Sequence, residues 1–276
     1  MTGSSSATSL DEHERKPSVK TKKHLPLWQE TILLLTIAIL LAIVIKAFFV
    51  QAFYIPSESM EPGLVKNDRI LVEKMSYWFG GTPQRGDVVV FKDPGGWLSE
   101  EEDAGPSNPI GQAMAKIGLY PSGGHLVKRV IGVGGDTIHC CDKQGRILVN
   151  GHPLDENAYI KNTPGMQCNG PMTSTCNWTA GPVPKGMLFV MGDNRDNSDD
   201  STRHLCQPKV PDCTPDPYVP VDDVVGKVFV LLWPYDRFHV LHRPGDFAGV
   251  PAPSANSDKP EKSDKNTGSK SGTKGQ

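Results

Sequence analysis

Apolar residues form two patterns along this chain, one long continuous run near the N-terminus and a series of short runs after residue 50. The long run, residues 31–45, contains two threonines and otherwise only Ile, Leu, Ala and Val. As a helix, residues 27–49 would measure about 34 Å, which matches the hydrocarbon thickness of a bilayer. The run therefore predicts a transmembrane helix over residues 25–49.

The short runs are rich in β-branched residues and are bounded by Gly, Pro, Asn or Asp, a pattern typical of strands joined by turns. The predicted strands are 69–72, 87–91, 126–133, 146–149, 187–191 and 224–233. Asn150-Gly151 is a strong signal for a tight hairpin turn. We therefore expect a mainly β body over residues 50–245, with inserted loops near 97–124 and 161–185.

Polar segments without hydrophobic periodicity flank this body and predict a disordered arm over residues 1–24 and a disordered C-terminal tail over residues 246–276. The arm has five basic and three acidic residues, and all its basic residues lie between Arg15 and Lys23. Basic residues next to a membrane helix stay in the cytoplasm. The arm is therefore predicted to be cytoplasmic, and the β body to lie on the outer side of the cell membrane.

A cleaved export signal is the alternative interpretation of the apolar run. Val50-Gln51-Ala52 has the small-x-small pattern of a cleavage site. Lys46, Phe48 and Phe49 interrupt the approach to that site, which favours a retained helix. Both interpretations place the β body outside the cytoplasm.

Composition narrows the class of protein further. The 276 residues include 28 glycines and 24 prolines, which is high for a helical bundle and ordinary for short strands joined by turns. The formal net charge is −2. Because phosphate recognition requires a basic excess, this balance argues against nucleic acid as a partner.

All six cysteines follow the apolar run, and an even number in an exported domain suggests disulfides. The pairs close enough in sequence to clip a loop are Cys168 with Cys176 and Cys206 with Cys213. The adjacent Cys140 and Cys141 are left unassigned. No C-x-x-C pattern is present, and we expect neither a metal nor a cofactor.

The first segment with candidate chemistry is Pro56-Ser57-Glu58-Ser59-Met60-Glu61-Pro62, directly after the predicted membrane exit. Ser57 and Ser59 are two residues apart on a proline-flanked, extended segment, so their side chains face the same side. One can act as a nucleophile and the other as an adjacent hydrogen-bond donor. The alternative is a juxtamembrane linker, in which Pro and Ser are common.

The second candidate is Lys128, which lies within the apolar run from Leu126 to Val133. It is either an exposed edge residue or a buried amine. Burial disfavours the charged form of an amine, so a buried lysine can serve as a general base toward a serine hydroxyl.

The third segment, Gly192 to Ser201, follows a predicted strand and is rich in Asp and Asn. Counted from Asn194, its sixth position is Asp199 and its twelfth is Leu205, where a calcium-binding EF-hand loop requires Gly and Glu. The calcium interpretation fails, and the composition favours a rigid hydrogen-bonded network that supports a site.

Together these segments resemble the type I signal peptidases, membrane-anchored serine proteases that remove signal peptides from exported preproteins. Residues 56–62 are similar to the nucleophile motif P-S-x-S-M-x-P, and residues 68–72 to the next family motif. Residues 128–132 with Gly135-Asp136 are similar to the lysine motif, and residues 192–201 to G-D-N-R-D-N-S-x-D-S. Four motifs in the right order after one apolar segment make the resemblance specific.

The resemblance implies that Ser59 is the nucleophile and Lys128 its general base. It implies that Ser57, with the backbone N–H of Ser59, forms the oxyanion hole, and that Ser198 orients the lysine amine. The implied supporting network consists of Asp193, Arg195 and Asp200. The residues implied to bind the substrate are Phe53, Ile55, Pro56, Met60, Leu64, Leu126 and Val127.

The resemblance further implies a mainly β fold, an antiparallel β-sheet or barrel-like body behind one N-terminal transmembrane helix, and cleavage after Ala-x-Ala sites. We expect the preprotein to add an extended strand to segments 53–57 and 125–128. The expected partners are the signal peptides of secreted preproteins and the lipid bilayer, with the export translocon as a further candidate.

Two positions depart from the family pattern. Gly63 stands where Thr is usual, and Thr202 separates Ser201 from Arg203, whereas the family commonly has Arg at once. The competing hypothesis is a membrane-tethered β domain that binds cell-envelope partners without catalysis. It predicts that Ser59 and Lys128 are dispensable.

Overall fold

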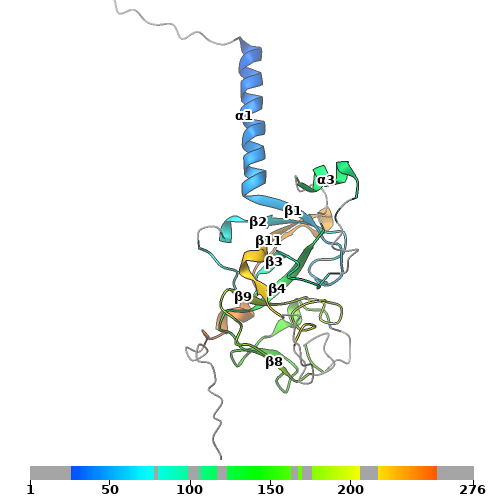
Figure 1. The fold of residues 1–276 in the computed structure, drawn as a ribbon, viewed down its shortest axis with the longest axis vertical. Coiled ribbons are helices and arrows are strands. Elements are labelled where there is room, and N and C mark those ends of the chain that lie inside the picture. The colour runs from blue at the N-terminus through cyan, green and yellow to red at the C-terminus, as the bar shows by residue number, and fades with distance from the viewer. Residues whose placement is uncertain are drawn as a thin grey trace, which may run out of the picture. The chain divides into compact units, whose positions relative to one another are not determined.

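The computed structural model describes residues 26–77, 80–98, 105, 107–116, 123–162, 167–169, 176–205 and 217–253. The chain divides into two compact units, Met1–Ile43 and Val44–Gln276. Helix α1 (Leu27–Phe48) begins in the first unit and ends in the second, and all the β strands lie in the second unit (Figure 1). The predictions for residues 1–24, for Cys206 and for Cys213 lie outside the described residues.

Helix α1 forms from the long apolar run, and every residue from Thr31 to Ile43 is exposed. The hydroxyls of its two threonines donate to backbone carbonyls one turn earlier in the helix. Thr31 Oγ1 donates to the Leu27 carbonyl at 2.9 Å, and Thr36 Oγ1 donates to the Ile32 carbonyl at 2.8 Å. Among the described residues, no helix has both the length and the hydropathy required to cross a membrane. A transmembrane role for residues 25–49 stays a prediction.

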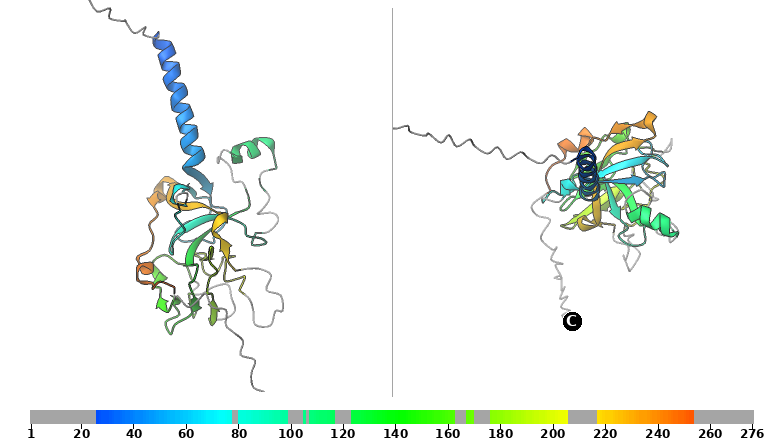
Figure 2. Two further views of the ribbon diagram at one scale, coloured as in Figure 1. Left: turned by 60° about the vertical axis from the view of Figure 1, so that its left-hand side comes forward. Right: turned by 90° about the horizontal axis from the view of Figure 1, so that it is seen from above.

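The β body is built on a sheet with the strand order β1-β2-β11-β3-β4-β9-β10, in which β12 also pairs with β11. These strands are β1 (Val50–Tyr54), β2 (Arg69–Glu73), β3 (Val88–Lys92), β4 (His125–Val133), β9 (Met187–Met191), β10 (Val219–Pro220), β11 (Val224–Trp233) and β12 (His239–Val240). Strands far apart in sequence, such as β2 and β11, therefore lie side by side (Figure 2).

A second sheet has the order β7-β6-β5-β8. Its strands are β5 (Ile138–Cys140), β6 (Ile147–Val149), β7 (His152–Pro153) and β8 (Trp178–Ala180). Asn150 and Gly151 form the hairpin turn between β6 and β7, both with positive φ (51° and 78°). All the strand pairings in both sheets are antiparallel, so the predicted mainly β, antiparallel fold is confirmed.

Short helices connect the strands. They are α3 (Pro109–Lys116) and the 3-10 turns η1 (Met75–Tyr77), η2 (Glu156–Ala158), η3 (Val221–Asp223), η4 (Tyr235–Arg237) and η5 (Gly245–Gly249). Both segments expected as inserted loops thus carry regular structure, since α3 lies within 97–124 and β8 within 161–185.

Residues 246–253, expected as part of the disordered tail, pack on the β body, and the prediction for residues 254–276 lies outside the described residues. Phe247 is buried in the same apolar cluster as Ile138 and Phe189, and the carbonyl of Pro251 accepts hydrogen bonds from Arg85 and Asn150. A single aromatic residue among Asp, Ala, Gly, Val and Pro gives no periodic pattern, so the sequence does not reveal that residues 246–253 pack on the body.

The central strands of the main sheet are covered on both faces. On β3, Val88 and Val90 pack in one apolar cluster, whereas Val89 and Phe91 pack in another. This alternation follows from the two-residue period of a strand. The neighbouring strand β4 is correspondingly buried, and a lysine within it is removed from water.

Two disulfides are present in the described residues, Cys168–Cys176 and Cys140–Cys141. The sulfur atoms of Cys140, Cys141 and Cys168 all lie within 4.8 Å of one another, so both disulfides belong to one region of the second sheet. The pairing of the adjacent Cys140 and Cys141 was left open by the sequence analysis.

Candidate active site

The segment after β1 brings the two serine hydroxyls together. Its ends are fixed by Ile55, whose N–H donates to the Asp68 carbonyl at 2.9 Å, and by Leu64, whose N–H donates to the Met60 carbonyl at 3.0 Å. Ile55, Met60 and Leu64 are buried in one apolar cluster. Ser59 is only 8% exposed, and its Oγ lies 3.3 Å from the Oγ of Ser57.

Lys128 lies on β4 opposite Val89 of β3 and is 3% exposed. Leu126 and Val130, two positions before and two positions after it in the strand, are also buried. The structure therefore favours the buried amine over the exposed edge lysine. Strand β4 also pairs with β9 through Arg129 and Met191, which places Lys128 beside the strand that leads into residues 192–201.

The loop of residues 192–201, called here the support loop, holds the Ser59 segment by its backbone. The Asn194 N–H donates to the Ser59 carbonyl at 3.0 Å, and Asn194 Nδ2 donates to the Glu58 carbonyl at 3.0 Å. Gly192 passes so close that a Cβ at this position would lie 2.5 Å from the Ser59 carbonyl oxygen. Only glycine permits this approach.

Within the support loop, Asp200 fixes the hydroxyl of Ser198. One carboxylate oxygen of Asp200 accepts from Ser198 Oγ at 2.5 Å and from the Gly192 N–H at 2.8 Å. The other accepts from the Thr202 N–H at 3.0 Å and from Thr202 Oγ1 at 2.7 Å. Because Ser198 donates its proton to Asp200, its oxygen is left to accept a hydrogen bond from another group.

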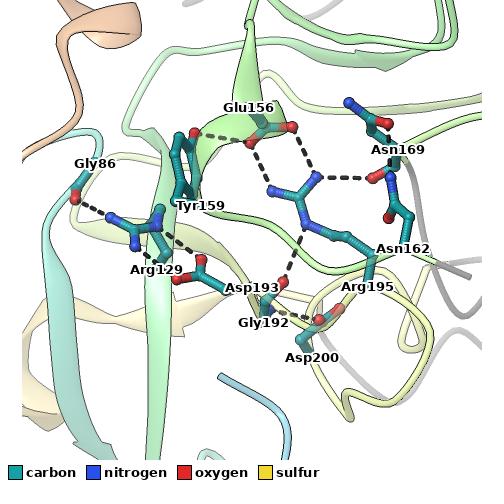
Figure 3. Close-up of polar contacts among 10 residues, drawn as sticks. All are labelled: Gly86, Arg129, Glu156, Tyr159, Asn162, Asn169, Gly192, Asp193, Arg195 and Asp200. Atoms are coloured by element: carbon teal, nitrogen blue, oxygen red, sulfur yellow. Dashed lines mark hydrogen bonds and ion pairs between the residues drawn. The ribbon is translucent and has the colours of Figure 1, made fainter. Parts of the chain in front are cut away.

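Two buried ion pairs anchor the support loop to the rest of the body (Figure 3). Arg129 donates to both carboxylate oxygens of Asp193, at 2.8 and 2.6 Å. Arg195 donates to both carboxylate oxygens of Glu156, at 2.7 and 2.6 Å, and through Nε to the Gly192 carbonyl at 3.0 Å. Figure 3 also shows Tyr159 between the two pairs, with its hydroxyl directed at Glu156.

The electrostatics of this network favour its charged form. Burial alone lowers the pKa of both guanidinium groups, but the adjacent carboxylates outweigh burial and raise the pKa of Arg129 and Arg195 above the usual value. Burial and, second, the charge of Glu156 raise the pKa of the Tyr159 hydroxyl. Tyr159 therefore stays a neutral donor, and its ring also faces Arg129, whose Cζ lies 4.5 Å from the ring centroid.

Most of the residues expected to bind substrate lie on one side of the sheet. Phe53 and Val127 pack, partly buried, against the cluster that contains Ile55, Met60 and Leu64. Leu126 packs instead in the cluster with Val89 and Phe91, because adjacent side chains of a strand point to opposite faces. Pro56 is exposed.

A cavity of about 230 Å³ lies behind the Ser59 segment. Its lining includes Met60, Gly63, Leu64, Arg129, Asp193 and His242. A Cβ at Gly63 would lie 3.8 Å from the Met60 carbonyl and 3.9 Å from Asp193 Oδ2, which are ordinary contact distances. The cavity therefore has room for the side chain that glycine lacks.

Three members of the network were not predicted as site residues: Arg129, Glu156 and Tyr159. Arg129 stood inside a recognised motif, but its partner on the support loop is far away in sequence. Glu156 lies between the exposed Asp155 and Asn157, and no local pattern indicates that it is buried. Arg203, whose role the sequence left open, lies outside the network and makes a half-exposed pair with Asp199 at 3.5 Å.

Comparison with known proteins shows the family to which the chain belongs. A family profile described as "Signal peptidase, peptidase S26" matches residues 28–233. The chain belongs to this family of peptidases.

Individual relatives extend the match over most of the chain. The chain is similar to signal peptidase I of Mycobacterium tuberculosis (strain H37Rv), with 38% identity over 255 residues that cover 85% of this chain and 84% of the relative. The probable signal peptidase I of Mycobacterium leprae is 39% identical over 242 residues, 79% of this chain and 80% of the relative. A crystal structure of a signal peptidase I from Enterococcus faecalis covers 52% of this chain and 95% of its own at 22% identity, with a TM-score of 0.30, which is too low to support an argument.

Proposed function

We propose that this chain is a membrane-bound endopeptidase that removes N-terminal signal peptides from exported preproteins. The family match and the relatives named signal peptidase I support the reaction class. One observation carries the assignment of the site. The support loop connects the buried Ser59 with the strand that carries the buried Lys128. Asn194 of this loop donates to the Ser59 carbonyl, and β9, which leads into the loop, pairs with β4, the strand of Lys128. The Ser59 hydroxyl lies 3.3 Å from the hydroxyl of Ser57.

In the proposed reaction, Lys128 Nζ removes the proton of Ser59 Oγ as this oxygen attacks the scissile carbonyl carbon. The resulting oxyanion accepts hydrogen bonds from Ser57 Oγ and from the Ser59 N–H. The protonated lysine then gives its proton to the leaving amine, which frees the mature protein and leaves the signal peptide esterified to Ser59. A water molecule, deprotonated by Lys128, hydrolyses this ester.

Ser198 has the role of aiming the lysine amine. Its own proton is committed to Asp200, so its oxygen can accept an N–H from Lys128 and direct the lone pair toward Ser59. An amine has no tautomers, so no third residue is required to select one, in contrast to the histidine of a Ser-His-Asp triad.

Substrate selection is proposed to combine backbone pairing with small pockets. An extended preprotein segment would pair with residues 53–57 and 125–128. Phe53 and Val127 pack, partly buried, against Ile55, and pockets bounded by these apolar side chains would suit the small residues of an Ala-x-Ala site. The exposed apolar surface of α1 supports a role as membrane anchor, which would keep the site near the bilayer from which a signal peptide emerges.

The proposal is tested by incubating the full-length protein, in detergent, with a purified preprotein and following release of the mature protein. Ser59→Ala and Lys128→Ala should each abolish detectable cleavage while the protein remains folded. Ser76→Ala and Lys92→Ala are matched controls on the exposed surface and should cleave like the parent chain. Retained cleavage by either dyad variant would contradict the proposed mechanism, and an inactive parent chain would contradict the proposed function.

A further inference from the structure

Glu156 is a fully buried carboxylate, 0% exposed, at the start of the 3-10 turn η2. Burying a carboxylate is costly unless it is paired and hydrogen-bonded. Here both oxygens accept from Arg195, and one also accepts from the Tyr159 hydroxyl at 3.2 Å. The proposed reaction does not use Glu156.

Arg195 links Glu156 to the support loop by hydrogen bonds to both. Besides its two bonds to Glu156, the guanidinium donates to the Gly192 carbonyl at 3.0 Å and to the Asn169 carbonyl at 2.7 Å. A guanidinium held by a bidentate carboxylate has a fixed plane, so its remaining N–H groups point in fixed directions. The position of Gly192 therefore depends on where Glu156 holds Arg195.

Gly192 and its neighbours in turn contact the reacting serine. Gly192 lies against the Ser59 carbonyl and Ser198, and Asn194, adjacent to Arg195, donates to the Ser59 carbonyl. A chain of contacts thus runs from Glu156 through Arg195 to Gly192 and Asn194, and from these to Ser59. Each step is a hydrogen bond, a close backbone approach or, from Arg195 to Asn194, a peptide bond, and all of these residues are buried.

We propose that Glu156 is a positioning residue for peptide cleavage: through Arg195 it fixes the support loop against Ser59 and Ser198. The inference rests on the proposed function of the site. Among the described hydrogen bonds, Glu156 accepts from Arg195 and Tyr159 and from no group of Ser59, Ser198 or the expected substrate-binding segments 53–57 and 125–128. Its effect therefore belongs to kcat, because it sets the alignment of groups that react.

The test compares Glu156→Gln with the parent chain, as full-length protein in detergent, by measuring kcat and KM for a purified preprotein. Glutamine keeps the volume but turns one acceptor into a donor that faces the donors of Arg195. We expect kcat to fall by about tenfold to a hundredfold with KM nearly unchanged, since a small misplacement of reacting groups has effects of this size. Glu156→Asp keeps the charge with a shorter reach and should lose less.

Asp87→Asn is the matched control. Asp87 is 2% exposed and pairs with Arg243 at 2.8 Å, but it has no hydrogen bond to the support loop among the described contacts. The Asp87→Asn variant should lower the melting temperature, as Glu156→Gln does. Its kcat per folded molecule should stay within about twofold of that of the parent chain. Equal loss of kcat in both variants would reduce Glu156 to a stabilising residue and overturn the proposal.

A double-mutant cycle with Arg195→Met separates positioning from general stability. If Glu156 acts through Arg195, adding Glu156→Gln to Arg195→Met should lower kcat no further. Additive losses, or an unchanged kcat in Glu156→Gln, would overturn the inference. If Glu156→Gln fails to fold, Glu156→Asp replaces it under the same criteria. If the parent chain cleaves the preprotein and Glu156→Gln has the same kcat, only the positioning role is refuted. If the parent chain itself is inactive, the proposed function is refuted.

Discussion

At the scale of single residues, the proposed mechanism depends on two serine hydroxyls, Ser57 and Ser59, whose oxygens lie 3.3 Å apart. One belongs to the proposed nucleophile, and the other is close enough to donate to an oxyanion that forms on the attacked carbonyl. Such a donor contributes to the transition state more than to the bound substrate, because the charge on the oxygen develops only during the reaction.

Ser57→Ala should therefore lower kcat by a few hundredfold, equivalent to about 3 kcal/mol of lost transition-state stabilisation, with little change in KM. Ser57→Thr keeps a hydroxyl at the same position and should retain most of the activity. Steady-state kinetics on a preprotein checks both variants. An unchanged kcat in Ser57→Ala would remove Ser57 from the oxyanion hole.

Two glycines near Ser59 should respond in opposite ways to an added side chain. Gly63→Thr extends into the cavity at ordinary contact distances and reduces the freedom of the unfolded chain, so it should raise stability by about 0.5–1 kcal/mol. Gly192→Ala would place its Cβ against the Ser59 carbonyl and should displace the segment, with loss of activity. Thermal unfolding and cleavage assays distinguish the two, and an active, stable Gly192→Ala variant would contradict the described packing.

The sequence was informative about residues that occur in compact motifs and silent about residues that act through distant partners. The spacing of Ser57 and Ser59 and the apolar flanks of Lys128 are local patterns, and the structure buries both Ser59 and Lys128. The burial of Glu156 depends on Arg195, 39 positions later in the chain. No local periodicity encodes such a pair, so it emerges only when the sheets bring the two segments together.

At the scale of elements, six of the strands could be predicted, but the partner of each strand could not. The β-branched runs became β2, β3, β4, β6, β9 and β11 because each has the length and boundaries of a strand. The placement of β11 between β2 and β3 is a long-range pairing that no single run reveals. The short strand β8 was missed because its three residues, between the Cys168–Cys176 loop and Gly181, carry too little pattern.

The Cys168–Cys176 disulfide closes a loop that contacts Arg195 of the support loop. This loop contains Asn169, whose carbonyl accepts a hydrogen bond from Arg195 at 2.7 Å. Replacing both cysteines by serine should lower the free energy of unfolding by about 2–3 kcal/mol, the value expected for a loop of this length. It should also reduce kcat moderately, since Arg195 loses an anchored acceptor. Chemical denaturation and kinetics under non-reducing conditions check this, and an unchanged stability would show that the loop is not a constraint on folding.

At the scale of the whole molecule, the proposal assigns membrane attachment to the apolar segment and catalysis to the β body. The full chain, expressed in a bacterial host, should remain with the membranes after alkaline extraction. A variant that lacks residues 1–49 should extract more readily. Equal extraction of the two proteins would contradict a role for α1 as the anchor.

The identity of the bond that is cut tests the central claim most directly. Mass spectrometry of the products from one preprotein, incubated with the full-length chain, should give a single mature N-terminus directly after an Ala-x-Ala sequence. Lys128→Ala should give none, and replacing the alanine before the cut by a large residue should prevent cleavage. Cleavage at other bonds, or cleavage by Lys128→Ala at the same bond, would contradict a signal peptidase that uses Ser59 and Lys128.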